Sequence, residues 1–167
     1  MKFYIGVDPG NKGALCLLDP LGKTIRFVDT PDLKNLVPSV RAVFRGLPPV
    51  DWIIALAIED VHSVHNSSAK SNFQFGRNLG AIESIIAYWY MDYTYITPKK
   101  WQEICEITFT YPKGATSAQK SKIRKATTAA RALELYPDAP LYGPRGGLLD
   151  GRSDALMIAH ALSIMGD

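Results

Sequence analysis

The sequence is poor in the residues that build disulfides and thiolate metal sites. Its 167 residues include two cysteines and three histidines. Cys16 and Cys105 each lie inside an apolar segment and show no paired spacing, which favours reduced core thiols in an intracellular protein. No apolar run approaches the length that crosses a bilayer, and residues 1–10 enter a strand pattern with no sign of a signal peptide. We therefore expect a cytoplasmic protein with no membrane partner.

Internal repeats, low-complexity tracts and a large net charge are also absent. The formal net charge is +3, with 47% hydrophobic and 21% charged residues. This balance is typical of soluble globular proteins and not of disordered ones. A chain of this length suits one domain with its own core, so we expect residues 1–167 to form a single domain. The net charge is too small to indicate a partner, and only its distribution is informative.

Patterns of apolar and turn residues divide the chain into strands and helices. Strand patterns lie at residues 3–7, 14–19, 23–29, 51–60 and 93–97. Helical patterns lie at residues 33–44, 72–90, 98–104, 117–135 and 152–165. Short connections join the first three strands, which predicts an antiparallel meander, and the later strands alternate with helices. This order favours an α/β fold with a mixed sheet covered by helices.

Acidic residues stand where the most strongly buried segments end. Asp8 follows the apolar run at residues 3–7, and Glu59 ends the apolar part of residues 51–60. Asp150 and Asp154 are four positions apart at the last helix, so their side chains share one face. Taken singly, Asp8 is equally typical of a residue that opens a turn, and Asp150 of a helix N-cap. Taken together, the carboxylates favour a common site.

Carboxylates without a matching set of cysteine or histidine ligands predict an all-oxygen metal site. Such a site suits Mg²⁺ or Mn²⁺ and disfavours structural zinc. Two of these ions, held roughly 4 Å apart, can activate a water and stabilise the leaving oxygen of a phosphodiester. The predicted metal ligands and catalytic residues are Asp8, Glu59, Asp150 and Asp154.

The segments IGVDPGNKGALCLLD, IIALAIEDVH and DGRSDALMIAHAL resemble the acidic blocks of RuvC-type Holliday junction resolvases, particularly their compact phage-like branch. The resemblance implies a ribonuclease H-like fold, with three antiparallel strands followed by two parallel ones and helices on both faces. It implies a homodimeric crossover junction endodeoxyribonuclease that uses two Mg²⁺ or Mn²⁺ ions on four-way DNA, in a bacterium or a phage-infected host cell. In that family the residues matching Asp8, Glu59 and Asp154 bind the metals, and a fourth acidic or histidine residue matches Asp150.

Two features depart from the family pattern. Asp150 and Asp154 are four positions apart, where the family commonly has three, so Asp150 is the least secure ligand. In bacterial members an aromatic residue shortly after the second carboxylate stacks on a splayed base. Here His62 and His65 stand in that region, and the next aromatic residue is Phe73. His62 is therefore a candidate for stacking on DNA, with a solvated loop histidine as the alternative.

Residues 107–133 contain no acidic side chain but many basic ones. The predicted DNA contacts there are Lys113, Lys120, Lys122, Arg124 and Lys125. The alternative is a solvated charged face, but the small polar loop at residues 111–122 suits phosphate contacts. The resemblance makes Lys113 and Lys120 the closest matches to a lysine-bearing segment of the family. We expect Lys120 to reach the active site as a catalytic residue, and Lys122 and Lys125 to contact phosphates only.

The helical pattern at residues 72–90 carries apolar side chains on more than one face. Besides its main stripe it has Ile85, Ala87 and Tyr88. This surplus suits packing against a second copy, which is how RuvC-type enzymes dimerise, or burial beneath a loop of the same chain. A two-fold dimer would present two active sites to the two symmetric strands of a junction.

Three other functions compete with junction resolution. The segment GVDPGNKG also resembles the phosphate loop of actin-like ATPases and sugar kinases, but AIEDVH lacks the glycine of their second motif. A non-catalytic DNA-binding module would gain nothing from buried acids that repel DNA. A nuclease of the same fold that cuts flaps, three-way junctions or replication intermediates would use identical chemistry, and the sequence leaves that alternative open.

Overall fold

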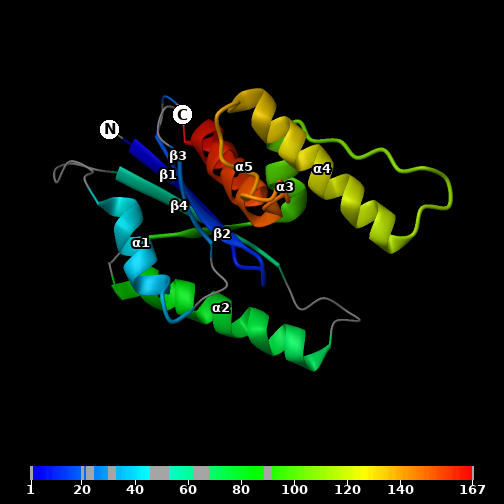
Figure 1. The fold of residues 1–167 in the computed structure, drawn as a ribbon. Helices are drawn as coiled ribbons and strands as arrows, with labels where there is room; N and C mark the ends of the chain where they lie inside the picture. The colour runs from blue at the N-terminus through cyan, green and yellow to red at the C-terminus, as the bar shows by residue number, and fades with distance from the viewer. Residues whose placement is uncertain are drawn as a thin grey trace.

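The strand patterns form one five-stranded sheet in the computed structural model, which describes residues 2–19, 21, 25–29, 33–45, 53–61, 68–88 and 92–166. In these residues the strands are β1 (Lys2–Asp8), β2 (Ala14–Leu18), β3 (Ile25–Asp29), β4 (Ile53–Glu59) and β5 (Thr94–Ile96). The helices are α1 (Leu36–Phe44), α2 (Ala69–Tyr88), α3 (Pro98–Ile104), α4 (Ser117–Leu135) and α5 (Asp150–Met165) (Figure 1).

The sheet is mixed, with the strand order β3-β2-β1-β4-β5. β1 pairs antiparallel with β2, and β2 pairs antiparallel with β3. β4 pairs parallel with both β1 and β5. The predicted arrangement of three antiparallel strands followed by two parallel ones is confirmed. It places the carboxyl ends of β1 and β4 side by side at one edge of the sheet.

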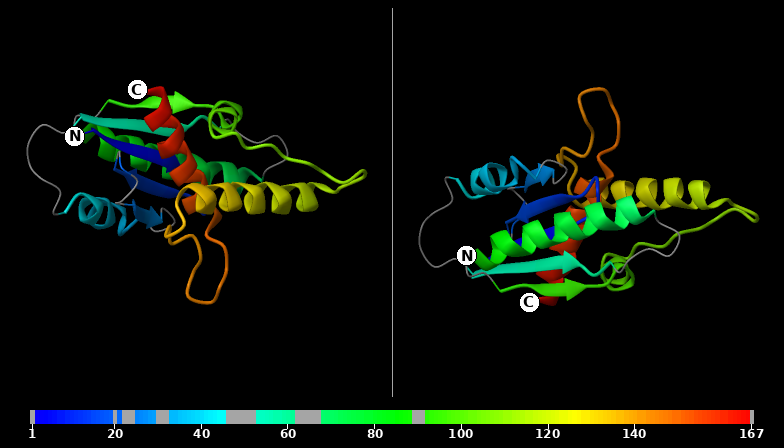
Figure 2. Two further views of the ribbon diagram at one scale, coloured as in Figure 1. Left: turned by 90° about the horizontal axis from the view of Figure 1, so that it is seen from above. Right: turned by 90° about the horizontal axis from the view of Figure 1, so that it is seen from below.

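Helices cover both faces of this sheet (Figure 1, Figure 2). α1 and α2 lie on the face where Phe3, Ile5 and Val7 of β1 are buried. α5 lies on the opposite face against β1 and β2, with α3 and α4 packed beside it. Because side chains alternate along a strand, Tyr4 belongs to the α5 side, and so does the end of β1 at Asp8.

Two glycines allow α5 to approach the sheet closely. A Cβ atom added to Gly6 of β1 would stand 2.1 Å from the carbonyl oxygen of Ala155. A Cβ atom added to Gly151 would stand 2.1 Å from the carbonyl oxygen of Lys12. A parallel bridge also joins Gly151 to Gly13, in the connection between β1 and β2. The first turns of α5 are therefore held against the end of β1.

The last helix begins earlier than its pattern predicts. α5 starts at Asp150, two residues before the expected start at residue 152. Leu149 is its N-cap, so the N-cap alternative for Asp150 is wrong. The Ser153 hydroxyl donates a hydrogen bond of 2.7 Å to the Asp150 carbonyl oxygen. Asp150 therefore lies in the first turn of α5.

α2 also differs from its pattern. It begins at Ala69, three residues before the predicted start, and is described as far as Tyr88. Ile82 and Ile86 are buried and Ile85 packs against the same core, so Ile85 does not belong to an exposed surplus. Tyr88 is 70% exposed, and Phe73 on the same helix is 68% exposed. The apolar surface that α2 leaves open is thus narrower than the sequence suggests.

Two further expectations concern the cysteines and the membrane. Cys16 and Cys105 are both buried and neither forms a disulfide. Among the helices described, none has both the length and the apolar character that spanning a bilayer requires.

Candidate active site

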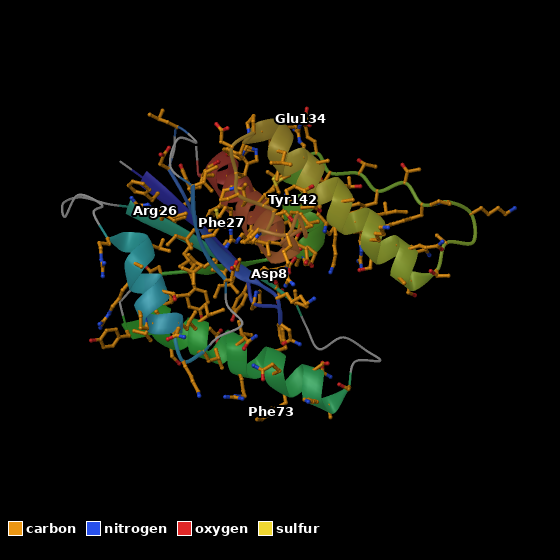
Figure 3. The ribbon with its side chains drawn as sticks, in the orientation of Figure 1. Asp8, Arg26, Phe27, Phe73, Glu134 and Tyr142 are labelled. Carbon is orange, nitrogen blue, oxygen red and sulfur yellow. The ribbon has the colours of Figure 1, made fainter. Side chains whose placement is uncertain are left out.

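Asp8 and Glu59 end two neighbouring parallel strands. In the register of β1 and β4, Val7 is the partner of Ile58, so the two carboxylates follow one step further along the sheet. Ala57 of β4 is buried against the α5 side of the sheet. Since side chains alternate, Asp8 and Glu59 both point to the face that carries α5. Figure 3 shows Asp8 at the end of β1, in the centre of the molecule.

Asp154 reaches the same place from the second turn of α5. The charges of Asp8, Glu59 and Asp150 each raise its pKa, after burial, which is the largest cause. The pKa of Asp154 therefore lies well above its usual value. Three predicted metal ligands thus come together, from the ends of two strands and from the helix packed on them.

The buried carboxylates are costly to ionise together. Burial raises the pKa of Asp8 to about 6, although a hydrogen bond from the Gly10 amide lowers it. Burial also raises the pKa of Glu59 to about 7, and the charge of Asp8 adds to the effect. A nearby cation favours the ionised form of carboxylates that are desolvated and repel one another.

Lys125 supplies one such cation. Its ammonium nitrogen lies 2.6 Å from Oδ2 of Asp150. Its charge also lowers the pKa values of Asp8 and Asp154, against the larger effect of burial. Lys125 therefore lies at the carboxylate cluster, and the sequence-based expectation that it contacts phosphates only stays a prediction.

Lys120 lies elsewhere on α4. It is exposed in the first turn of the helix, and its ammonium nitrogen lies 5.8 Å from the centre of the Tyr111 ring. In the described residues the contact between a lysine and the site's acids is made by Lys125, five positions further along. The catalytic role of Lys120 stays a prediction without a contact to support it.

Trp101 orients Glu59 and was missed by the sequence analysis. Its indole N–H donates a hydrogen bond of 2.9 Å to Oε1 of Glu59. The side chain is 2% exposed and lies in α3, which begins at Pro98 after the N-cap Thr97. A large aromatic residue in the first turn after an edge strand was the available signal, since a buried indole N–H needs an acceptor.

The turn after β1 is fixed from two sides. The Gly10 amide donates a hydrogen bond of 2.8 Å to Oδ1 of Asp8. The Asn78 amide group of α2 donates to the Gly10 carbonyl oxygen at 3.4 Å, and Gln74 donates to Asn78 at 2.9 Å. Asn78 is 1% exposed. Asp8 therefore both stabilises the turn after β1 and contributes a carboxylate to the candidate site.

The donor set fits a divalent cation by its chemistry. Asp8, Glu59 and Asp154 offer hard oxygen atoms in a site where burial, and to a smaller extent the neighbouring acids, raise their pKa values. Asp150 is engaged by Lys125, which makes it the least available of the four. In the part of the chain that is described, no group of three or more acidic, histidine or cysteine side chains has the arrangement that would hold a metal ion.

The other predicted DNA contacts lie on one projecting part of the molecule. Lys113 is exposed in the segment before α4, and Lys122 and Arg124 are exposed on α4 itself. Figure 2 shows α4 and the segment before it extending well beyond the sheet. His62 and His65 lie outside the described residues.

Comparison with known proteins identifies the fold. No protein-family model and no curated protein sequence matches the chain. Thermus thermophilus RuvC in complex with a Holliday junction substrate matches with a TM-score of 0.57 and 16% identity, over 99% of this chain and 97% of that one. Another Thermus thermophilus RuvC structure matches with a TM-score of 0.54 and 19% identity, over 97% of this chain and 95% of that one. The chain therefore has the RuvC fold, of the ribonuclease H-like class, as the sequence predicted.

Proposed function

We propose that this protein is a metal-dependent DNA endonuclease that resolves four-way junctions by paired hydrolysis of phosphodiester bonds. One observation carries the proposal: Asp8, Glu59 and Asp154 converge at the ends of two parallel strands under α5. This convergence occurs in a fold shared with a RuvC protein bound to a Holliday junction. We place its action in the cytoplasm, in DNA recombination or repair.

Asp8, Glu59 and Asp154 would hold the metal, Mg²⁺ or Mn²⁺, with Asp150 as a further ligand in some states. When bound, two such ions activate a water and stabilise the leaving oxygen of the phosphodiester. Around them, the Trp101 N–H holds one oxygen of Glu59, and the Gly10 amide holds one oxygen of Asp8. Both bonds leave the second carboxylate oxygen available.

The Lys125 ammonium would neutralise charge at the scissile phosphate. In the DNA-free protein it lies against Asp150. A phosphate brought to the carboxylates offers a second acceptor for the same donor. We therefore assign Lys125 the role that the sequence suggested for Lys120.

The basic surface of α4 supports DNA binding. Lys113, Lys122 and Arg124 are exposed, and no acidic residue interrupts residues 107–133. Such side chains position DNA through its phosphates without reading its sequence. Because the surface begins beside the carboxylates, DNA lying along α4 would bring a phosphodiester to them.

We also propose that the enzyme acts as a homodimer through α2. Phe73 and Tyr88 are both largely exposed on this helix, and Phe73 lies on the side away from the sheet (Figure 3). Two copies related by a two-fold axis would match the symmetry of a four-way junction. Simultaneous cuts in two strands are the expected consequence.

A panel of DNA substrates tests this function. We expect cleavage of a four-way junction with Mg²⁺ or Mn²⁺, in symmetric pairs, and weaker cleavage of three-way junctions, flaps and duplexes. Asp154→Asn is the control that should leave all of them intact. A preference for flaps or three-way junctions would favour the alternative of a different branched substrate. Absence of cleavage on every DNA with both metals would contradict nuclease function.

A further inference from the structure

A cavity of about 240 Å³ opens directly beside two of the carboxylates. Glu59, Asp154 and Lys125 line it. The remaining walls come from α3, α4 and the segment between them, and apart from Trp101 and Arg124 their side chains have no role in the proposed hydrolysis or DNA binding. These side chains therefore need an explanation of their own.

The composition of the cavity suits a nucleobase. Phe109 and the buried Trp101 supply flat aromatic surface, while Gln102, Ser121 and Thr128 supply hydrogen-bonding groups. An aromatic face can stack on a flat heterocycle, and an amide side chain offers both a hydrogen-bond donor and an acceptor to its edge. The volume lies below the roughly 300 Å³ at which drug-sized pockets begin, so it suits one base and not a base pair.

The aromatic surface continues from the cavity to the outside. The ring of Phe109 stacks on that of Tyr111, with the ring centres 6.3 Å apart and the planes inclined by 23°. Tyr111 is 37% exposed, and the Lys120 ammonium lies 5.8 Å from its ring centre. Proteins that bind unpaired nucleotides commonly stack the bases on aromatic rings and attract the phosphates with nearby basic side chains. Phe109, Tyr111 and Lys120 offer this combination.

The charge around the cavity is arranged for a nucleotide. Arg124 and Lys125 line the cavity and complement phosphate groups. Glu59 and Asp154, which line the same cavity, mark the place of the proposed hydrolysis. A base held in this cavity would therefore belong to a nucleotide beside the bond that is cut.

We propose that this cavity binds one unpaired nucleobase next to the scissile phosphate, stacked on Phe109 and hydrogen-bonded by Gln102. The proposal rests on the proposed nuclease function and adds a base-reading subsite to it. Bases inside a duplex are stacked and paired, whereas a branch point offers nucleotides that can be turned out at lower cost. The subsite gives cleavage a dependence on the base at one position beside the cut.

A double-mutant cycle that combines protein substitutions with abasic sites in the DNA tests the subsite. Single bases on either side of the cut in a four-way junction are replaced by abasic sites, and single-turnover cleavage is measured. We expect one position at which the loss of the base slows wild-type cleavage at least about tenfold, a typical effect of losing one stacked base. In Phe109→Leu and Gln102→Ala the same abasic site should change the rate less than about twofold, because the contact is already absent.

Two matched variants control for indirect effects. Phe109→Tyr keeps the aromatic ring and should retain the dependence on the base. Tyr142→Leu removes an aromatic side chain that is 52% exposed outside the cavity and should behave as wild type. Equal abasic effects in the wild type and in Phe109→Leu, or no sensitive position at all, would overturn the proposal.

A fluorescence measurement separates failure of the subsite from failure of the nuclease function. The junction carries 2-aminopurine at each position beside the expected cut, and its emission is recorded on binding without divalent metal. A change seen with wild type and lost in Phe109→Leu supports the subsite even if no DNA is cut. Cleavage without any such change at any position would remove the subsite and leave the nuclease proposal standing.

Discussion

Glu59 is a carboxylate whose ionised form is favoured by one hydrogen bond and opposed by its surroundings. Burial and the charge of Asp8 raise its pKa, whereas the Trp101 N–H lowers it. The same bond fixes the direction of one carboxylate oxygen. Groups that orient metal ligands in this way commonly affect metal affinity or activity by about 10–100-fold.

Trp101→Phe should therefore weaken metal use while preserving the fold. We expect the Mn²⁺ concentration for half-maximal cleavage to rise about tenfold, with much of the rate recovered at saturating Mn²⁺. The measurement is single-turnover cleavage against Mn²⁺ concentration, with thermal unfolding as the control for stability. An unchanged dependence on Mn²⁺ in a folded variant would contradict the orienting role.

The raised pKa values of Asp8, Glu59 and Asp154 predict how stability depends on pH without metal. A carboxyl group whose pKa is higher in the folded state favours folding at low pH, and this contribution is lost as pH rises through its folded pKa. The pKa values of about 6 for Asp8 and about 7 for Glu59 place this loss between about pH 4 and about pH 7. Metal-free protein should thus be less stable at pH 8 than at pH 5.

Thermal unfolding in EDTA across this pH range checks the prediction. Asp154→Asn should be more stable than wild type at pH 8, since it removes a carboxyl group that is costly to ionise in this site, and nearly equal at pH 4. Mn²⁺ should raise the wild-type melting temperature at pH 8 and not at pH 4. Equal stability of wild type and Asp154→Asn across the range would argue against a strained acidic cluster.

Substitution of three lysines of α4 distinguishes a role in hydrolysis from a role in DNA binding. Lys125→Ala should slow cleavage at least about tenfold at saturating enzyme, because its ammonium belongs to the carboxylate cluster. Lys122→Ala should instead weaken binding and reduce the salt slope by about one, with turnover unchanged. Lys120→Ala is measured beside them, over a range of salt. A slow Lys120→Ala with a normal Lys125→Ala would restore the assignment made from the sequence.

At the scale of elements, the close packing of α5 on the sheet requires glycine at position 6 of β1. Gly6→Ala would place a methyl group 2.1 Å from the Ala155 carbonyl oxygen and 2.4 Å from the Ala159 amide nitrogen. We expect a loss of about 2–4 kcal/mol in the free energy of unfolding, because backbone atoms on both sides must move.

Gly76→Ala is the matched control for this substitution. Gly76 lies in α2 with no atom within 4 Å of an added Cβ, so alanine should stabilise the helix by about 0.5–1 kcal/mol. Urea unfolding of both variants measures the difference. A Gly6→Ala protein as stable as wild type would show that α5 is not held as closely as described.

The elements that could be predicted are those with local patterns. The strands ending at Asp8 and Glu59 follow from apolar runs that stop at an acid, and their convergence follows from parallel pairing. Trp101 and Lys125 could not be placed in the same way, since their contacts depend on how α3 and α4 pack beside α5. The start of α5 at Asp150 was obscured because its N-cap, Leu149, is not a residue type that marks one.

At the scale of the molecule, the candidate site lies where the sheet meets the projecting basic part of the chain, α4 and the segment before it. α4 and the segment before it extend beyond the sheet (Figure 2), and Glu59 and Asp154 line a cavity that residues of α4 also line. In the proposed function, the basic side chains of α4 and the segment before it bind DNA, and the carboxylates hold the metal that hydrolyses it. The acids repel phosphate when metal is absent, so removing one should not weaken DNA binding.

The most direct test is cleavage and binding of one four-way junction, measured in parallel, by wild type and by Asp8→Asn, Glu59→Gln and Asp154→Asn. Each substitution keeps the size of the side chain and removes a charge that would hold metal. We expect each variant to lose about a thousandfold or more in single-turnover cleavage with Mn²⁺, since metal stabilisation is worth several kcal/mol. Binding measured without metal should stay within about threefold of wild type, because these acids contribute no attraction for phosphate. Near-normal cleavage by any of the three, or a loss of binding equal to the loss of cleavage, would contradict a metal-dependent nuclease site built on these carboxylates.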